Sequence, residues 1–202
     1  MDAETNPSSW LVLLAQLPSK PSSARVALWR RMRAAGATAV VNGSWMLPRT
    51  TAHEEFFEQS CEGVVRRGGT GFVLRVSGSS PESDESIVRL FQSDRSREYD
   101  EFAERCAALL SEINRESTAE KYTFAEMEES EQDLKKLARW LAKIQARDFF
   151  PNERGDQSVA LLAECRRALR DFSQAVYKAE GVQESAAGWD YPIALAPERE
   201  ER

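Results

Sequence analysis

Apolar and polar residues in the first third of the chain alternate between strand-like runs and helical spacings. Trp10 to Gln16 is a nearly unbroken apolar run, which predicts a buried strand. Between Ala24 and Ala35, the apolar residues Leu28 and Met32 fall on one helical face, and two serines in front of this segment can cap its start. Gly36 is expected to end this helix, because glycine readily adopts the left-handed conformation that follows a last helical turn.

The clearest local signal is the dipeptide Asn42-Gly43, which separates two short apolar segments. Asparagine and glycine tolerate the positive φ angles of a tight hairpin turn. We therefore expect strands at Ala37 to Val41 and at Ser44 to Leu47, paired as a hairpin that closes at Pro48.

A second helix and a fourth strand follow. Thr50 or Thr51 can cap a helix with an apolar side, and Gly68-Gly69 separates it from the apolar segment Phe72 to Val76. The order strand, helix, strand, strand, helix, strand predicts the α+β class, with a ferredoxin-like domain over residues 10–78. Such a domain carries both helices on one face of its sheet, so something else must cover the other face.

After residue 78 the chain becomes polar and then strongly helical. Residues 79–93 are predicted to be a linker or loop with a short helix, and residues 94–180 an antiparallel bundle of about three amphipathic helices. The second of these helices is expected to end near Asp148 and the third to begin near Gln157. Apolar residues recur in them at three- and four-residue steps: Tyr99, Phe102, Cys106, Leu109, Leu110 and Ile113; Leu134, Leu137, Leu141 and Ile144; Leu162, Cys165, Leu169, Phe172 and Val176. Residues 1–9 are a predicted leader and residues 181–202 a predicted tail.

The net charge of −6 is distributed unevenly. Residues 1–78 carry nine Lys or Arg against six Asp or Glu, a net charge of +3, whereas the remainder carries eighteen against twenty-seven, a net charge of −9. An anion should therefore prefer the first part. Nucleic-acid binding by this chain alone is disfavoured, because counterion release needs a dense cationic face. Trp29, Trp45 and Trp140 could stack on bases, but their apolar spacing favours core or domain-interface positions.

Location and redox state follow from two further patterns. The longest apolar run, Trp10 to Ala15, is too short for a bilayer and lacks the flanks of a signal peptide, so no membrane partner and a cytoplasmic location are expected. Cys61, Cys106 and Cys165 are an odd number of widely separated cysteines, which fits reduced, mostly buried thiols better than disulfides or a metal site.

Six segments of the chain resemble the amino-terminal domain of the chromate resistance protein ChrB family, and the resemblance as a whole runs from about residue 10 to 178. Three lie in the first part: Trp10-Leu-Val-Leu-Leu14, Leu28-Trp-Arg-Arg-Met-Arg-Ala-Ala-Gly36 and Asn42-Gly-Ser-Trp-Met-Leu-Pro48. Three lie in the helical part: Phe91-Gln-Ser-Asp-Arg-Ser-Arg-Glu-Tyr99, Phe124-Ala-Glu-Met-Glu-Glu129 and Leu137-Ala-Arg-Trp-Leu-Ala-Lys-Ile-Gln-Ala-Arg-Asp-Phe-Phe150.

The resemblance implies a chromate-responsive regulator that accompanies an efflux transporter. It also implies a first domain similar to the Cas2-like, ferredoxin-fold module of a class of bacterial repressors. Full-length members carry a further carboxy-terminal domain, with histidines and basic residues linked to sensing, and this chain is expected to be a short member without it. The sensing and DNA-binding roles of the longer proteins are therefore not carried over to this chain.

The first predicted helix carries two groups of basic residues. Arg25, with Lys20 and the free amides of the helix start, could hold a divalent oxyanion such as chromate, sulfate or phosphate, because the helix dipole and the guanidinium fork both favour an anion there. Arg30 and Arg33 are expected to point outward, either as a solvated face or as a weak patch that contacts phosphates.

A second basic group begins the third predicted helix. Arg95 at a helix start opposes the dipole unless it pairs with an anion or a carboxylate, so it is a further candidate for the oxyanion. The alternative is an ion pair between the two domains, with Arg97, Glu98 and Asp148 as the other candidates.

Metal, cofactor and catalytic sites are not expected. The glutamates Glu126, Glu128, Glu129 and Glu131 fit an acidic first helical turn, with loose Mg²⁺ or Ca²⁺ contact as an alternative, but His53 is the only histidine and lies in the other domain, which excludes a helical di-iron site. No nucleophile motif or phosphate loop occurs in the sequence.

Three functions remain open. The first is a non-enzymatic regulatory or accessory protein of chromate or oxyanion stress, which acts by oxyanion binding or partner contact. The second is a protein-interaction or dimerisation module of a transcriptional regulator, because ferredoxin-like sheets often pair through a face or an edge. The third is a chromate reductase, which would need a flavin or nicotinamide cofactor that nothing in the sequence specifies.

Overall fold

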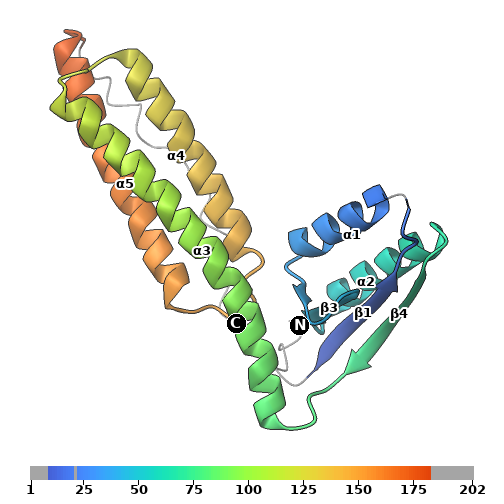
Figure 1. Cartoon of the computed structure of the whole chain (residues 1–202). Coiled ribbons are helices and arrows are strands. Elements are labelled where there is room, and N and C mark those ends of the chain that lie inside the picture. The colour runs from blue at the N-terminus through green and yellow to red at the C-terminus, as the bar shows by residue number, and fades with distance from the viewer. Residues whose placement is uncertain (1–8, 21, 183–202) are drawn as a thin grey trace. The chain divides into compact units, whose positions relative to one another are not determined.

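The computed structural model describes residues 9–20 and 22–182. These residues form two compact units (Figure 1). The first unit contains the residues up to Asp94 together with Arg147–Phe150, and the second contains Arg95–Ala146 and the residues from Pro151 onward. The predicted leader and tail lie outside the described residues, apart from Ser9, Gly181 and Val182. Within the described part of the chain, no helix is both long and apolar enough to span a membrane.

The first unit contains a four-stranded antiparallel sheet. Its strands are β1 (Trp10–Gln16), β2 (Thr38–Ala39), β3 (Ser44–Pro48) and β4 (Thr70–Val76), in the order β2-β3-β1-β4. The central strand β1 pairs with β3 on one side and with β4 on the other, without a bulge in either register. The sequence predicts these four strands, but β2 is shorter than expected and β4 begins two residues earlier.

The predicted hairpin turn is present between β2 and β3. The amide of Ser44 donates to the carbonyl oxygen of Val41 at 2.9 Å, and Gly43 has a φ angle of +81°. A side chain on Gly43 would approach the carbonyl oxygen of Ala15 to 2.9 Å. Glycine is therefore required here both by its φ angle and by the close approach of β1.

Helices α1 (Ser22–Ala34) and α2 (Thr51–Val65) pack on one face of this sheet. The Oγ1 atom of Thr50 accepts the amide hydrogen of His53 and caps α2, as the sequence predicts. Alternate residues of β1 and β3 face these helices and form a buried core with them. The core consists of Leu11, Leu13, Met32, Ala37, Trp45, Leu47 and Phe57.

The other face of the sheet is covered in part by the first turns of α3 (Pro81–Thr118) and by residues 149 and 150. Trp10, Met46 and Phe91 are buried there, and the rings of Trp10 and Phe91 stack with their centroids 5.8 Å apart. Residues 79–93 are therefore not a linker. The polar residues that predict a linker here belong to the start of α3. This part of the helix buries a single side and leaves the remainder of its surface in water.

Helices α3, α4 (Phe124–Gln145) and α5 (Glu153–Ala179) supply the second unit with a core of its own. Thr123 caps α4 and Asn152 caps α5, which begins four residues before the predicted start. The apolar stripes predicted from the sequence converge in this core. Its buried members are Tyr99, Phe102, Cys106, Leu109, Ile113, Met127, Leu137, Leu141, Ile144, Leu162, Cys165, Leu169, Phe172 and Val176.

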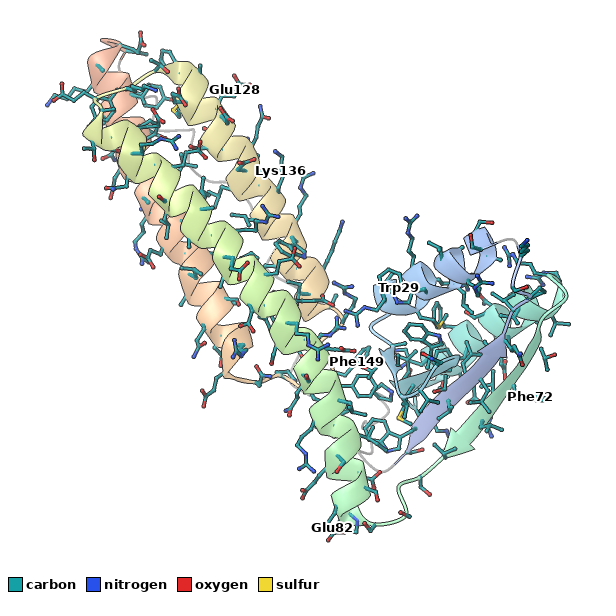
Figure 2. All side chains as sticks on the ribbon, in the orientation of Figure 1. Trp29, Phe72, Glu82, Glu128, Lys136 and Phe149 are labelled. Carbon is teal, nitrogen blue, oxygen red and sulfur yellow. The ribbon has the colours of Figure 1, made fainter. Side chains whose placement is uncertain are left out.

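The tryptophans singled out in the sequence have different environments. Trp45 is buried in the first unit, and Trp140 packs against the core of the second. Trp29, labelled on α1 in Figure 2, is 54% exposed, so of the two predicted positions, core or domain interface, the core position is wrong for it. One helical turn buries the side with Leu28 and Met32 and leaves the neighbouring side in solvent.

Candidate functional site

The start of α1 does not present its basic residues as a dedicated anion site. Lys20 and Arg25 are both exposed. Nη1 of Arg25 donates to the carbonyl oxygen of Pro18 at 2.8 Å and also to that of Ser19. The guanidinium therefore holds the loop before α1, and this use of its donors competes with any anion.

Arg25 also lies at the rim of an open, mostly apolar groove between α1 and the β2–β3 hairpin. The groove has a volume of 620 Å³. Val26 and Trp29 of α1, together with Val40 and Val41 of the hairpin, line it and are exposed. We call this the α1 groove. Its apolar lining suits an apolar side chain better than a hydrated oxyanion.

A different set of arginines converges on a smaller hollow between α1 and the end of α2. Arg31, Arg66 and Arg67 line this space of 270 Å³, together with Gln59 and Ser60. None of the described residues that line it is acidic. We call it the arginine hollow. The sequence does not reveal it, because Arg31 lies on α1 whereas Arg66 and Arg67 lie in the turn directly after α2, and only the packing of α1 beside α2 brings them together.

Each arginine of the hollow is held in place by a contact within the first unit. The guanidinium of Arg31 lies 5.0 Å from the ring centre of Phe56. Nη1 of Arg67 donates to the carbonyl oxygen of Gly63 at 2.8 Å. Arg66 forms an exposed ion pair with Glu62, one turn earlier on α2, with Nη1 3.3 Å from Oε2. Since a guanidinium has five N–H donors, these contacts leave donors that can face an anion.

Arg33 has a structural role in the first unit, so the prediction that it points outward is wrong. Its Nη1 lies 3.1 Å from Oδ2 of Asp94, and the hydroxyl of Thr38 donates to the same oxygen at 3.1 Å. Arg147 donates to the backbone carbonyl oxygen of Arg33 at 3.0 Å. A helical wheel of α1 could not include these partners, which lie far away in the sequence. Arg30 is exposed, as predicted.

Arg95 is inaccessible to an anion in solution, since its side chain is 1% exposed. Its Nη1 lies 3.0 Å from Oε1 of Glu98, one turn further along α3. Of the predicted ion-pair candidates, Glu98 therefore pairs within its own helix. Arg97 is exposed and Asp148 is half-buried.

The predicted acidic helix start and the histidine have ordinary structural roles. Glu126 lies in the first turn of α4, and Glu131 pairs with Lys135 at 3.1 Å. The Nδ1 atom of His53 lies 2.7 Å from the carbonyl oxygen of Pro48, and its ring packs edge-on against Phe149. Within residues 9–20 and 22–182, no three His, Cys, Asp or Glu side chains are grouped so that they could hold a metal ion.

The cysteines are free thiols. Cys106 and Cys165 meet in the core of the second unit, where Sγ of Cys165 lies 3.7 Å from the carbonyl oxygen of Cys106. The hydrogen bond with Cys165 and burial both raise the pKa of Cys106, which keeps this thiol protonated at neutral pH. Cys61 is half-buried on α2 and is more accessible than the other two.

Comparison with known proteins assigns the sequence of this chain to a family. A family model described as "Protein ChrB, N-terminal" matches residues 25–183. Protein ChrB of Cupriavidus metallidurans is 27% identical over 169 residues, which make up 84% of this chain and 47% of the relative. The chain thus spans about half the length of the curated relative that it matches.

Proposed function

Because the chain belongs to the family of the ChrB amino-terminal domain, we propose that it is a non-enzymatic regulatory or accessory protein of chromate resistance that binds an oxyanion in the arginine hollow. The observation that carries this proposal is the convergence of Arg31, Arg66 and Arg67 on one hollow without an acidic side chain in its lining. A cytoplasmic location belongs to the same proposal.

The chemistry of the hollow suits a tetrahedral dianion. Guanidinium groups donate paired N–H bonds to oxyanions, and their charge is permanent at any physiological pH. Helix α1 supplies Arg31, and the turn after α2 supplies Arg66 and Arg67. The net charge of +3 over residues 1–78 adds a favourable long-range field.

The proposal places the anion away from Lys20, Arg25 and Arg95, the candidates from the sequence. Arg25 already donates to two carbonyl oxygens, and Arg95 is buried beside Glu98. Lys20 and Arg25 remain a weaker alternative at the start of α1, because both are exposed.

Calorimetric titration of the full chain with chromate, sulfate and phosphate at low chloride tests the proposal. We expect saturable heat for the wild type. Arg31→Gln and Arg67→Gln should each weaken binding by roughly tenfold, because each removes one charge-assisted hydrogen bond. Arg30→Gln is the matched control, since Arg30 lies next to Arg31 but outside the hollow.

Three outcomes separate the alternatives. Loss of heat in Arg25→Gln alone would move the site to the start of α1. Equal weakening in Arg30→Gln would indicate a diffuse charge effect and not a built site. Absence of heat at millimolar concentrations of every anion would exclude oxyanion binding and leave contact with a partner, for which the α1 groove offers an exposed apolar surface.

The fold supports a finer description of both units, which we include in the proposal. The order β2-β3-β1-β4 with two helices on one face is the arrangement expected of a ferredoxin-like, Cas2-like domain. The shared core of α3, α4 and α5 supports an antiparallel three-helix bundle. A DNA-binding role is not part of the proposal, because the second part of the chain is strongly acidic.

A further inference from the structure

The outer edge of β4 is an unprotected strand edge. β4 pairs with β1 along all seven of its residues, and no strand of the described chain pairs with its other side. At the opposite end of the sheet, β2 has only two residues. Proteins usually blunt a long edge with proline, charged side chains or a bulge, because open N–H and C=O groups recruit another strand. β4 contains no proline and no bulge, and its one charged side chain, Arg75, is paired with Glu54 of the same chain.

Large apolar side chains are exposed on both faces of the sheet beside this edge. On the face opposite α1 and α2, Phe72 is 59% exposed, and Leu74 and Leu14 are exposed beside it; Phe72 is labelled on β4 in Figure 2. On the helical face, Val65 of α2 is 56% exposed and lines a shallow hollow with Val73. We call this surface the β4 edge patch. Exposed apolar residues grouped in this way mark interaction surfaces.

We propose that the β4 edge patch binds a second copy of this chain, with the two β4 strands paired antiparallel about a twofold axis at Val73. This register is the only one that pairs all seven residues of the strand with those of its copy. It places Phe72 opposite Leu74 of the other copy, and Leu74 opposite Phe72. Aromatic and aliphatic residues in such cross-strand positions stabilise a sheet.

The charges on the strand agree with a second copy as the occupant. Arg75 is the only charged residue of β4, and in this register it faces Gly71 of the other copy and not another arginine. Arg75 is also neutralised within its own chain, because its Nε donates to Oε1 of Glu54 at 2.6 Å. A twofold contact therefore brings no like charges together on the strand.

The test measures the mass of the full chain in solution by light scattering or sedimentation over a wide concentration range. The wild type should have twice the chain mass of 22.8 kDa. Phe72→Lys with Leu74→Lys should shift it to the mass of one chain, because lysines then face lysines across the axis. Phe72→Glu with Leu74→Glu should do the same. An equimolar mixture of the two double variants should recover the dimer, because opposite charges then face each other.

Val26→Lys with Trp29→Lys is the matched control, since it replaces two exposed apolar residues of the α1 groove, and it should remain dimeric. Far-UV circular dichroism checks that each variant is folded. A wild type with the mass of one chain at every concentration would overturn the proposal. This holds even if β4 then pairs with a strand of a different protein. A dimer that survives both β4 double variants, a mixture that stays monomeric, or a control that dissociates would also overturn it.

Discussion

At the scale of single residues, the roles of polar side chains depend on partners that are distant in sequence. Trp10 is fully buried, and its Nε1 donates to Oδ1 of Asp84 at 2.7 Å across 74 positions. The same oxygen accepts the amide hydrogen of Gly78 at 3.1 Å. Asp84 thus joins the first strand, the loop after β4 and the first turn of α3.

Asp84→Ala should lower the free energy of unfolding by about 1–3 kcal/mol, because it leaves the buried indole N–H of Trp10 without its acceptor. Urea denaturation followed by tryptophan fluorescence measures the change. Asp84→Asn is the control that keeps an acceptor oxygen, and it should cost clearly less. Equal losses in the two variants would show that the charge matters more than the hydrogen bond.

The arginines show the same dependence on distant partners. The sequence predicts an outward-pointing Arg30, which is exposed, but the carbonyl partners of Arg25, the partners of Arg33 and the burial of Arg95 come from packing. The arginine hollow joins Arg31 of α1 to the turn after α2, more than thirty positions further along the chain, and no spacing rule within one helix can reveal it.

At the scale of elements, local signals in the sequence place most starts and ends within a few residues. Gly36 ends α1 with a φ angle of +80°, and Thr50 caps α2. The start of α3 is the main exception, because its first turns carry many serines and acidic residues and bury only one narrow side against the sheet. A helix of this kind lacks the wide apolar stripe on which periodicity depends.

Gly36 and Gly68 both have a positive φ angle, but only Gly36 has close neighbours. Replacing each with alanine therefore distinguishes the cost of backbone strain from the cost of steric crowding. Gly68 has a φ angle of +74° and no atom within 4 Å of the position that a Cβ atom would occupy, so Gly68→Ala should cost about 1 kcal/mol from the left-handed conformation alone. Gly36→Ala should cost more, roughly 2–3 kcal/mol, because its methyl group would also lie 3.0 Å from Cβ of Arg147 and 3.1 Å from Cε2 of Phe149.

Thermal and urea denaturation of the two variants measure this difference. Equal losses would mean that residues 147–149 move aside without cost, and the packing of this segment on the end of α1 would then be loose.

At the scale of the whole molecule, the chain buries its apolar residues in separate cores. Two clusters lie on the two faces of the sheet in the first unit, and a third joins α3, α4 and α5 in the second. The family match spans parts of both units. The three cysteines are distributed between them, with Cys61 in the first unit and the other two in the core of the second.

Thiol labelling reports on this distribution. With a disulfide reagent at neutral pH, Cys61 should react quickly, whereas Cys106 and Cys165 should react only when denaturant opens their core. Burial limits access to both, and the raised pKa of Cys106 further lowers its thiolate fraction. The amount of thiolate that the reagent releases over time shows whether one cysteine or all three react quickly. Rapid reaction of all three in the absence of denaturant would contradict the buried core.

The sequence by itself determined the order of strands and helices, the hairpin at Gly43, the stripes that build the helical core and the family. These features depend on local backbone preferences and on apolar periodicity, which act over a few residues. Only the tertiary structure decided that the first turns of α3 cover the sheet, that Arg31 meets Arg66 and Arg67, and that β4 is an open apolar edge. Each of these depends on which surfaces remain after packing, and that is a property of contacts between residues far apart in the chain.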